Sequence, residues 1–255
     1  MVQRKYLTSH KKDYSLTEEQ IKFYQDNGYL LVKGVFSKHE VDIVRKHMDE
    51  FAGDLVTNYL NMHYYKSLKK IHRGKRMYDI ADQVLNSRAI PIGSIAFFCK
   101  PNNPLENGST WHQDNYAGKS TPNSYLNLAL AVDNADSSNG SLKVIPGSHK
   151  LGDLPCKPKP NFTVDEKGRR FNNAPIGNAL ELPENPNIVQ LEYESGDVLV
   201  LNGLTIHKAD KNLHNDRWRR TMYYVYVKDG EPFFPGWTAK RCLLERYDSP
   251  KVKKR

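Results

Sequence analysis

The first part of the chain shows the polar caps and apolar spacing of helices. Residues 17–20, Thr-Glu-Glu-Gln, have the form of a capping box, which predicts a helix to about Asp26 with Gly28 as its C-terminal stop. The run YLLVKGVF then predicts a strand and a turn. Ser37 is the predicted cap of a second helix, whose apolar positions recur at helical spacing: Val41, Val44, Met48 and Phe51.

From residue 94 onward the pattern changes to short β-prone runs with turn residues between them. The predicted strands lie in SIAFFCK (94–100), SYLNLALAVDNA (124–135), SLKVIPGSH (141–149), EYESGDVLVLNG (192–203) and RWRRTMYYVYVKDG (217–230). Short strands that alternate with turns are typical of a sandwich or barrel and not of a parallel sheet. We therefore expect a mainly β fold.

Residues 153–187 interrupt this pattern, because they hold many Pro, Asn and Lys residues and little periodicity. So long a connection is usually functional or disordered, and a lid is one interpretation. The length of 255 residues fits one large domain, or at most two small ones. We expect a single domain over residues 1–255, with flexible tails at 1–14 and 247–255.

Composition and charge disfavour several classes of protein. The chain is 38% hydrophobic and 26% charged, has no apolar run near the ~18 residues of a membrane span, and begins without the apolar segment of a signal peptide. An odd count of three cysteines favours the cytoplasm over a disulfide framework. The net charge of +9 lies largely in the two ends of the chain and in residues 66–76, and a solvated surface explains it. Attraction of small anions is another interpretation. Nucleic-acid binding is disfavoured, because the sequence shows no nucleic-acid-binding motif.

The pattern His-x-Asp, which can form half of a metal site, occurs three times. His47/Asp49 fall in the predicted second helix, where residues two apart point roughly 200° apart. His214/Asp216 fall in a charged segment that we interpret as a solvated loop. His112/Asp114 follow a β-rich region, and residues i and i+2 of a strand share a face, so both side chains can converge on one ion.

A third ligand is needed, because two protein ligands rarely suffice. Two histidines and one carboxylate, with open positions, mark non-haem Fe(II) oxygenases. His207 in NGLTIHKAD is the candidate, and a core histidine with a satisfied hydrogen bond is the alternative. His149 in PGSHK is interpreted as a turn residue.

The last predicted strand carries a candidate anion site. By period two, Arg219, Thr221 and Tyr223 share one face of that strand. A guanidinium on an inward face is costly without an anionic partner, and Arg suits bidentate binding of a carboxylate. The alternative is that Arg219, like Arg217 and Arg220, is an edge charge in water.

Together these stretches make the chain resemble the phytanoyl-CoA dioxygenase family of Fe(II)- and 2-oxoglutarate-dependent oxygenases. The matching stretches follow one another in order over about residues 16–227: LTEEQIKFYQDNGYLLVKGVFSKHEV, WHQD, NADSSNGSLKVIPGSHKLG, ESGDVLVLNGLTIH and RRT. The resemblance implies a double-stranded β-helix, or jelly roll, with the N-terminal helices packed outside it.

The resemblance also implies the ligands. Iron would be bound by His112, Asp114 and His207. 2-Oxoglutarate would chelate the iron through its 1-carboxylate and 2-keto oxygens and would pair its 5-carboxylate with Arg219, to which Thr221 could add a hydroxyl. Dioxygen is the other cosubstrate, and ascorbate is a candidate reductant.

This chain departs from the family's pattern near the cosubstrate. The arginine usually stands eleven residues after the distal histidine, where this chain has Trp218. A one-residue insertion, or Arg217 or Arg220 as the true partner, would explain the shift. Ala129 stands where many relatives have tryptophan, which suggests extra room. Further cosubstrate candidates are Asn127, Gln113 and Lys100, the last of which has a surface lysine as its alternative.

The substrate is expected to be a small molecule, and the basic segments favour an anionic or polar one. Weak candidates for its pocket are Trp111, Tyr116, Tyr125 and Tyr223, with packing alone as the alternative. Halogenating relatives lack the carboxylate that Asp114 supplies, so hydroxylation, desaturation or ring closure is favoured over chlorination. The alternatives are a jelly roll that binds metal without oxygenase activity and a basic nucleic-acid-binding scaffold. The sequence indicates no oligomeric state.

Overall fold

The computed structural model of the chain describes residues 14–50, 58–60, 68, 71, 74–102, 108–159, 162–164, 170–172, 177–235, 241–246 and 248. Its α-helices are α1 (Glu18–Asn27), α2 (Lys38–Asp49), α4 (Lys75–Leu85) and the short α5 (Asn115–Gly118), and 3₁₀ turns lie at Ser137–Asn139 and Ser148–Leu151. The strands are β1 (Tyr29–Val32), β2 (Asn58–Leu60), β3 (Ala89–Cys99), β4 (Tyr125–Ala131), β5 (Leu142–Val144), β6 (Cys156–Lys159), β7 (Phe162–Val164), β8 (Arg170–Asn172), β9 (Gly177–Leu180), β10 (Val189–Gln190), β11 (Val198–Asn202), β12 (His207–Ala209) and β13 (Arg219–Lys228). Among these helices none is long and apolar enough to cross a bilayer.

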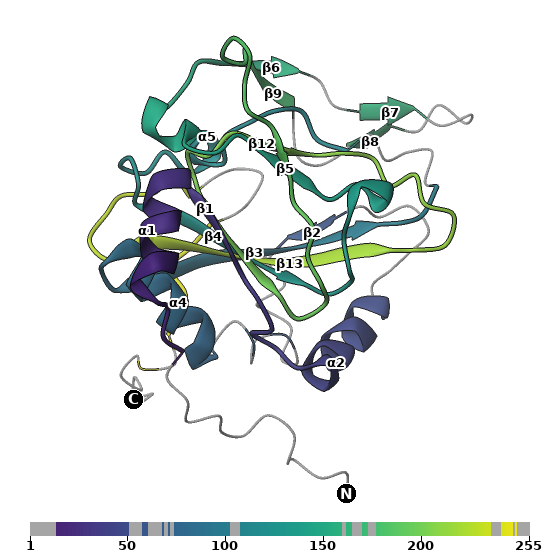
Figure 1. Cartoon of the computed structure of the whole chain (residues 1–255), viewed down its shortest axis with the longest axis horizontal. Coiled ribbons are helices and arrows are strands. Elements are labelled where there is room, and N and C mark those ends of the chain that lie inside the picture. The colour runs from purple at the N-terminus through teal and green to yellow at the C-terminus, as the bar shows by residue number, and fades with distance from the viewer. Residues whose placement is uncertain are drawn as a thin grey trace, which may run out of the picture.

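Two antiparallel sheets form the body of the fold (Figure 1). In the part of the chain that the structure describes, the larger sheet has the order β1-β11-β4-β13-β3-β2 and the smaller one β10-β5-β12. From β10 to β13 the chain passes back and forth between them, so that β10 and β12 lie in the smaller sheet and β11 and β13 in the larger. This is the winding of a double-stranded β-helix, and the expected fold class is confirmed.

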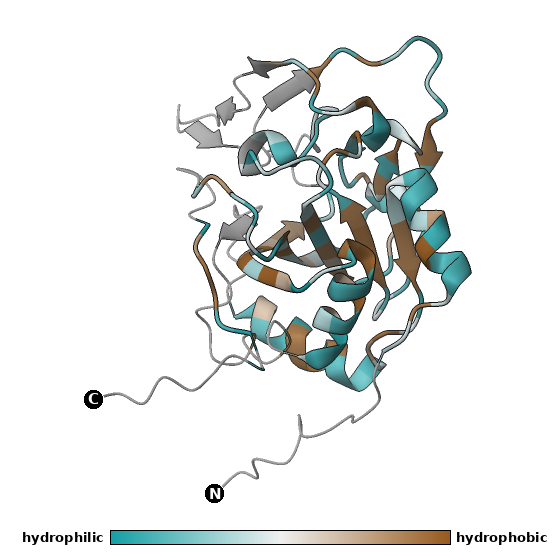
Figure 2. Cartoon of the chain, turned by 90° about the vertical axis from the view of Figure 1, so that its left-hand side faces the viewer, coloured by the Kyte–Doolittle hydropathy of each residue, from teal (hydrophilic) through white to brown (hydrophobic). Residues whose placement is uncertain are grey.

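The helices α1, α2 and α4 cover the outer face of the larger sheet. The capping boxes at Thr17 and Ser37 form as predicted, and Gly28 ends α1 in the left-handed conformation. Apolar side chains of the helices pack with the outward residues of the strands in one cluster, which includes Val44, Met48, Met77, Ile80, Leu128, Val200 and Tyr224. Each such side chain contributes about 1.5–3 kcal/mol when it is fully buried. Figure 2 shows the result, with hydrophobic strands beside helices that turn hydrophilic faces outward.

The inner face of the larger sheet looks toward the smaller sheet and is built by strand alternation. On β4 the inward residues include the small Ala129 and Ala131, which pack with Leu142 and Val144 of β5. On β13 the outward residues alternate with the inward Arg219, Thr221 and Tyr223. This arrangement leaves polar groups of β13 inside the jelly roll, as the period-two argument predicts.

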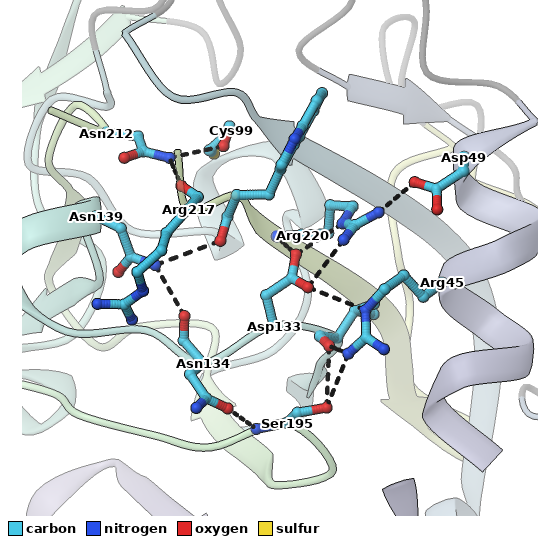
Figure 3. A network of polar contacts seen from close by, with 12 residues as sticks. Arg45, Asp49, Cys99, Asp133, Asn134, Asn139, Ser195, Asn212, Arg217 and Arg220 are labelled. Carbon is cyan, nitrogen blue, oxygen red and sulfur yellow. Dashed lines mark hydrogen bonds and ion pairs between the residues drawn. The ribbon is translucent and has the colours of Figure 1, made fainter. Parts of the chain in front are cut away.

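Arg220, by contrast, points outward into a polar network that ties α2 to the sheet (Figure 3). Its Nε and Nη2 donate to the two oxygens of Asp133, at 2.7 and 3.0 Å, and its Nη1 bonds Asp49. Arg45 of α2 also donates to Asp133, at 3.1 Å, and reaches Ser195. Arg220 is therefore a structural residue of the outer face and not an edge charge in water.

The structure corrects three expectations about the elements. The strand β3 begins at Ala89, before the predicted range 94–100. The helix α4 was not predicted. It starts at Lys75, inside the basic run 66–76, and most of that run lies outside the described residues. The segment 153–187 is not without secondary structure, because β6 pairs with β9 and β7 with β8. The expected tails lie outside the described residues except for Tyr14, whose amide donates to Asp79, and Asp248, which pairs with Arg88. A role as a lid stays a prediction.

Candidate metal centre

Three side chains from two distant parts of the sequence, residues 112–114 and residue 207, meet at the start of β12. His112 and His207 form an antiparallel bridge, in which each amide donates to the other's carbonyl at 3.0 Å. Their rings lie side by side with centroids 4.3 Å apart. Nε2 of His112 lies 3.5 Å from Oδ1 of Asp114, and Nε2 of His207 lies 3.5 Å from its Oδ2. The candidate ligand atoms of all three residues lie within 4.8 Å of one another, which fits a single metal ion.

The local backbone brings His112 and Asp114 together by a turn. Only His112 lies in a β-bridge, and Asp114 has helical angles, φ −72° and ψ −28°, at the start of α5. The predicted convergence is present, but it does not come from two residues on one strand face. The turn is fixed by the amide of Asn115, which donates to the carbonyl of Gly203 at 2.7 Å.

Backbone carbonyls fix the orientation of both histidine rings. Nδ1 of His112 lies 2.7 Å from the carbonyl of Thr110, and Nδ1 of His207 lies 2.9 Å from that of Thr205. A carbonyl can only accept, so Nδ1 carries the proton in both neutral rings and Nε2 is left with a lone pair. Both lone pairs face Asp114, and such a second hydrogen bond is the usual support of a metal-bound histidine.

Charges within the triad shift its pKa values. Burial would raise the pKa of Asp114, but the neighbouring histidines hold it well below its usual range, so the carboxyl is ionised. Burial lowers the pKa of His207 to about 4. Burial acts the same way on His112, but the hydrogen bond and charge of Asp114 outweigh it and raise the pKa. An ionised carboxylate beside a neutral His207 is the state that a divalent cation requires.

Two predicted cosubstrate residues lie beside the triad. Asn127 of β4 donates from Nδ2 to Oδ2 of Asp114 at 2.5 Å, and its buried Oδ1 has no hydrogen-bond partner among the described residues. Gln113 is buried and donates to the carbonyls of Gly152 and Leu204, while its Oε1 accepts from the amide of Leu154. These bonds favour a structural role for Gln113 over the predicted contact with a cosubstrate.

A second polar group lies farther along the interior, at Arg219. This side chain is buried, and its Nε donates to the carbonyl of Asn139 at 3.1 Å. Thr221 is its inward neighbour on β13. Tyr193, which bridges Ala135 between β10 and β11, has a pKa that burial raises and that the charge of Arg219 lowers, so it lies near this group. The hydroxyls of Thr221 and Tyr193 are buried without a hydrogen-bond partner among the described residues. Along the sheet, Tyr223 lies between this group and the triad, because it follows Thr221 on the inner face and pairs with Ala129, the inward neighbour of the Asn127 that holds Asp114. Burial raises the pKa of Tyr223 far above its usual range.

The remaining predicted residues lie in varied surroundings. Tyr125 is buried and accepts a hydrogen bond from Arg241, whereas Tyr116 is 42% exposed. Trp111 is half-buried beneath the ammonium of Lys208, and Lys100 is half-buried just after β3. The other histidines stay away from the triad: His149 contacts the carbonyl of Gln25, His47 pairs with Glu50 and His214 with Asp216.

Sequence reasoning missed two residues of this interior, Tyr193 and Arg241. Tyr193 lies in EYESGD, where the turn residues drew attention, and it gives no signal beyond its spacing from β11. Arg241 follows the last strand in a segment with no periodic pattern. Both reach the interior only through tertiary packing, so no local rule points to them.

Comparison with known proteins agrees with this geometry. The family model described as phytanoyl-CoA dioxygenase (PhyH) matches residues 45–221. Phytanoyl-CoA dioxygenase 1 of Oryza sativa subsp. japonica is 27% identical over 250 residues, which cover 78% of this chain and 85% of the rice protein.

Solved structures show the same fold at low sequence identity. The epimerase SnoN, in complex with Fe3+, alpha ketoglutarate and nogalamycin RO, superposes with a TM-score of 0.69 at 19% identity over 86% of each chain. The carbocyclase SnoK superposes with a TM-score of 0.67 at 18% identity, over 90% of this chain and 91% of its own. Since the family model spans more than half of the sequence, this chain belongs to the phytanoyl-CoA dioxygenase family of Fe(II)- and 2-oxoglutarate-dependent oxygenases.

Proposed function

We propose that the protein binds Fe(II) through His112, Asp114 and His207 and, with 2-oxoglutarate and dioxygen, hydroxylates a small anionic or polar metabolite with release of succinate and CO2. The observation that carries the proposal is the orientation of the two imidazoles. Both Nδ1–H groups are committed to backbone carbonyls, and both Nε2 lone pairs point at an ionised carboxylate. Two histidines and one carboxylate leave further positions of an octahedral ferrous ion for the cosubstrates.

The polar group around Arg219 supports a place for the far carboxylate of 2-oxoglutarate. Buried hydroxyls are normally hydrogen-bonded, and those of Thr221 and Tyr193 lack partners among the described residues. A carboxylate beside Arg219 would accept from both hydroxyls and from the guanidinium. Asn127 would keep Asp114 in place at the other end of the cosubstrate, because its amide already holds Oδ2.

The reaction type rests on the carboxylate of the triad. When bound, iron and 2-oxoglutarate supply an oxidant that can attack a substrate C–H bond. The fold alone leaves the outcome open, because its solved neighbours include an epimerase and a carbocyclase. Asp114 fills the position that a halide would take, and this favours hydroxylation over halogenation.

The metal site can be tested by spectroscopy and by turnover. Adding Fe(II) and 2-oxoglutarate without oxygen should produce a weak visible charge-transfer band, and admitting oxygen should release succinate. His112→Ala and His207→Ala should lose both signals while circular dichroism stays unchanged. His47→Ala and His214→Ala are matched controls, since these residues lie in a helix and a loop away from the triad. Retention of the band in either triad variant would contradict the assignment.

A further inference from the structure

Two segments of the chain carry the triad: the ligand turn (residues 111–116) and the distal loop (residues 203–207). The backbone bridge between the two histidines joins these segments at one end. At the other end the amide of Asn115 donates to the carbonyl of Gly203 at 2.7 Å. Between the two backbone contacts the segments are joined by a side chain, that of Gln113.

The carboxamide of Gln113 makes three hydrogen bonds to backbone groups. Its Nε2 donates to the carbonyl of Leu204 at 2.7 Å and to that of Gly152 at 2.9 Å. Its Oε1 accepts from the amide of Leu154 at 2.9 Å. Two of these partners can only accept and the third can only donate, so the amide has a single orientation. The side chain is also buried, and it therefore fixes the distance between the ligand turn and the distal loop.

The bond from Gln113 to Leu204 acts close to all three ligands. The next residue in the distal loop is Thr205, whose carbonyl orients the ring of His207. In the ligand turn, Gln113 itself stands between the other two ligands in the chain. A shift of Leu204 would move the group that orients His207, and a shift of Gln113 would move both of its neighbours.

The other two bonds of Gln113 lead to the base of the β6–β9 pair. Gly152 and Leu154 come shortly before β6 in the chain. At the end of β9 the amide of Leu180 donates to the carbonyl of Trp111, the first residue of the ligand turn, at 3.1 Å. Figure 1 shows β6, β9, α5 and β12 at the same end of the molecule. The ligand turn is thus bonded to both ends of this strand pair.

A metal site depends on groups that hold its ligands without touching the ion. Mutation of such groups typically lowers metal affinity about 10–100-fold. Ligands that are not held in place must be ordered when the ion binds, and this ordering reduces the free energy of binding. The chain brings the ligand atoms of the triad within 4.8 Å of one another, so this preorganisation is a property of the fold.

We propose that Gln113 is the positioning residue of the metal centre. Its carboxamide sets the spacing between the ligand turn and the distal loop and connects both to the base of the β6–β9 pair. The inference rests on the proposed function, because it takes the triad as the metal site. Gln113 acts through the ligands beside it and does not itself bind the ion.

Gln83 offers a matched control on the outer face of the larger sheet. Its Nε2 donates to the carbonyls of Tyr14 and Asp79, at 2.7 and 2.6 Å. Its Oε1 accepts from the amide of Leu16 at 3.0 Å. Gln83 therefore makes the same three kinds of bond as Gln113, but it makes them from α4 and away from the triad.

The test compares Gln113→Met with Gln83→Met in the full chain. Both changes keep the size of the side chain, remove three hydrogen bonds and should lower the melting temperature. Zn(II) affinity, measured by calorimetry, should fall by at least about tenfold in Gln113→Met and stay within about twofold of the wild type in Gln83→Met. The visible absorption of bound Co(II), which depends on how its ligands are arranged, should change in Gln113→Met alone.

Amide exchange in the wild type tests the same connection without a substitution. The amide of Leu154 is bonded to Gln113, and the amide of Leu16 is bonded to Gln83. If Gln113 connects the ligands to the base of the β6–β9 pair, saturating Zn(II) should slow exchange at Leu154 by at least about tenfold and at Leu16 by less than about twofold.

The outcomes separate this inference from the proposed function. Zn(II) binding that is absent from the wild type, or that survives in His112→Ala and His207→Ala, contradicts the metal site and the role of Gln113 with it. Binding that needs both histidines but is equal in wild type and Gln113→Met, or is weakened as much by Gln83→Met, overturns the role of Gln113 alone. If Gln113→Met does not fold, Gln113→Asn replaces it, because its amide is one methylene too short to reach both carbonyls. Unchanged Zn(II) affinity in that variant, with unchanged exchange at Leu154, overturns the proposal.

Discussion

Replacing Arg220 or Arg219, neighbours on opposite faces of β13, should have separable effects. Arg220→Met removes a buried guanidinium that bonds both oxygens of Asp133 and also pairs with Asp49. Removing one partner of a buried pair costs about 3–5 kcal/mol. Asp133 keeps Arg45 and the backbone amide of residue 220 as partners, so the loss of unfolding free energy should be about 2–3 kcal/mol. At about 2–4 °C per kcal/mol, the melting temperature should fall by about 4–12 °C.

Arg219→Met should instead act on the cosubstrate. Loss of a buried charge-assisted partner of a carboxylate costs about 2 kcal/mol or more, which corresponds to about thirtyfold or more in the 2-oxoglutarate concentration required. Urea denaturation and a titration of the anaerobic charge-transfer band measure the two effects on the same samples. A large change in 2-oxoglutarate affinity from Arg220→Met, with little from Arg219→Met, would show that the strand register is wrong by one residue.

Three further predictions concern backbone, pH and product. Gly28→Ala should lower the free energy of unfolding by about 1–3 kcal/mol, because φ is +77° and the added carbon would lie 2.4 Å from Oγ1 of Thr205. The control is Gly34→Ala, where φ is +61° and the surrounding space is open, and it should cost less in the same urea titration. Hydrogen bonds from Ser138 and Arg217 lower the pKa of Asp136 from 3.8 to about 2. Asp136→Asn should therefore lower the free energy of unfolding by about 0.5–1 kcal/mol at neutral pH. This difference in unfolding free energy from the wild type should shrink as pH falls from about 4 to about 2, because the wild-type carboxylate becomes protonated. With saturating chloride the wild-type product should carry oxygen and no chlorine, and Asp114→Gly should be mostly inactive; mass spectrometry showing a chlorine isotope pattern from the wild type would refute this.

The sequence predicted best where local rules decide the structure. The capping boxes at Thr17 and Ser37 and the alternation along β13 depend on neighbouring residues alone, and the structure has them as expected. The choice of His112 and Asp114 among three similar pairs also came from local geometry, since a helix and a loop hold the other two. The two residues lie together in the structure, and their binding of metal stays a prediction. The family resemblance added the overall winding, which no single element specifies.

Tertiary contacts account for what the sequence did not show. Asp114 meets the histidines through a turn held by Gly203, about ninety residues away in the chain. Gln113 lies between His112 and Asp114 and was predicted to contact the cosubstrate, yet its bonds go to the backbone of other loops. Arg241 lies beside Gly93 and donates from Nε to the Tyr125 hydroxyl, 116 residues away in the chain. Such partners are distant in sequence, and residue type alone does not identify them.

The backbone hydrogen bonds that hold β13 outnumber those that hold the His112–His207 bridge, and this difference affects which parts of the protein unfold locally. β13 is hydrogen-bonded to both β3 and β4 along most of its length, whereas His112 joins His207 by a single isolated bridge. Amide protons of β13 should therefore exchange only with global unfolding, while those of residues 112 and 207 exchange through smaller local openings. The group at Arg219 then stays assembled when the bridge opens, so metal can enter or leave a chain that is otherwise folded.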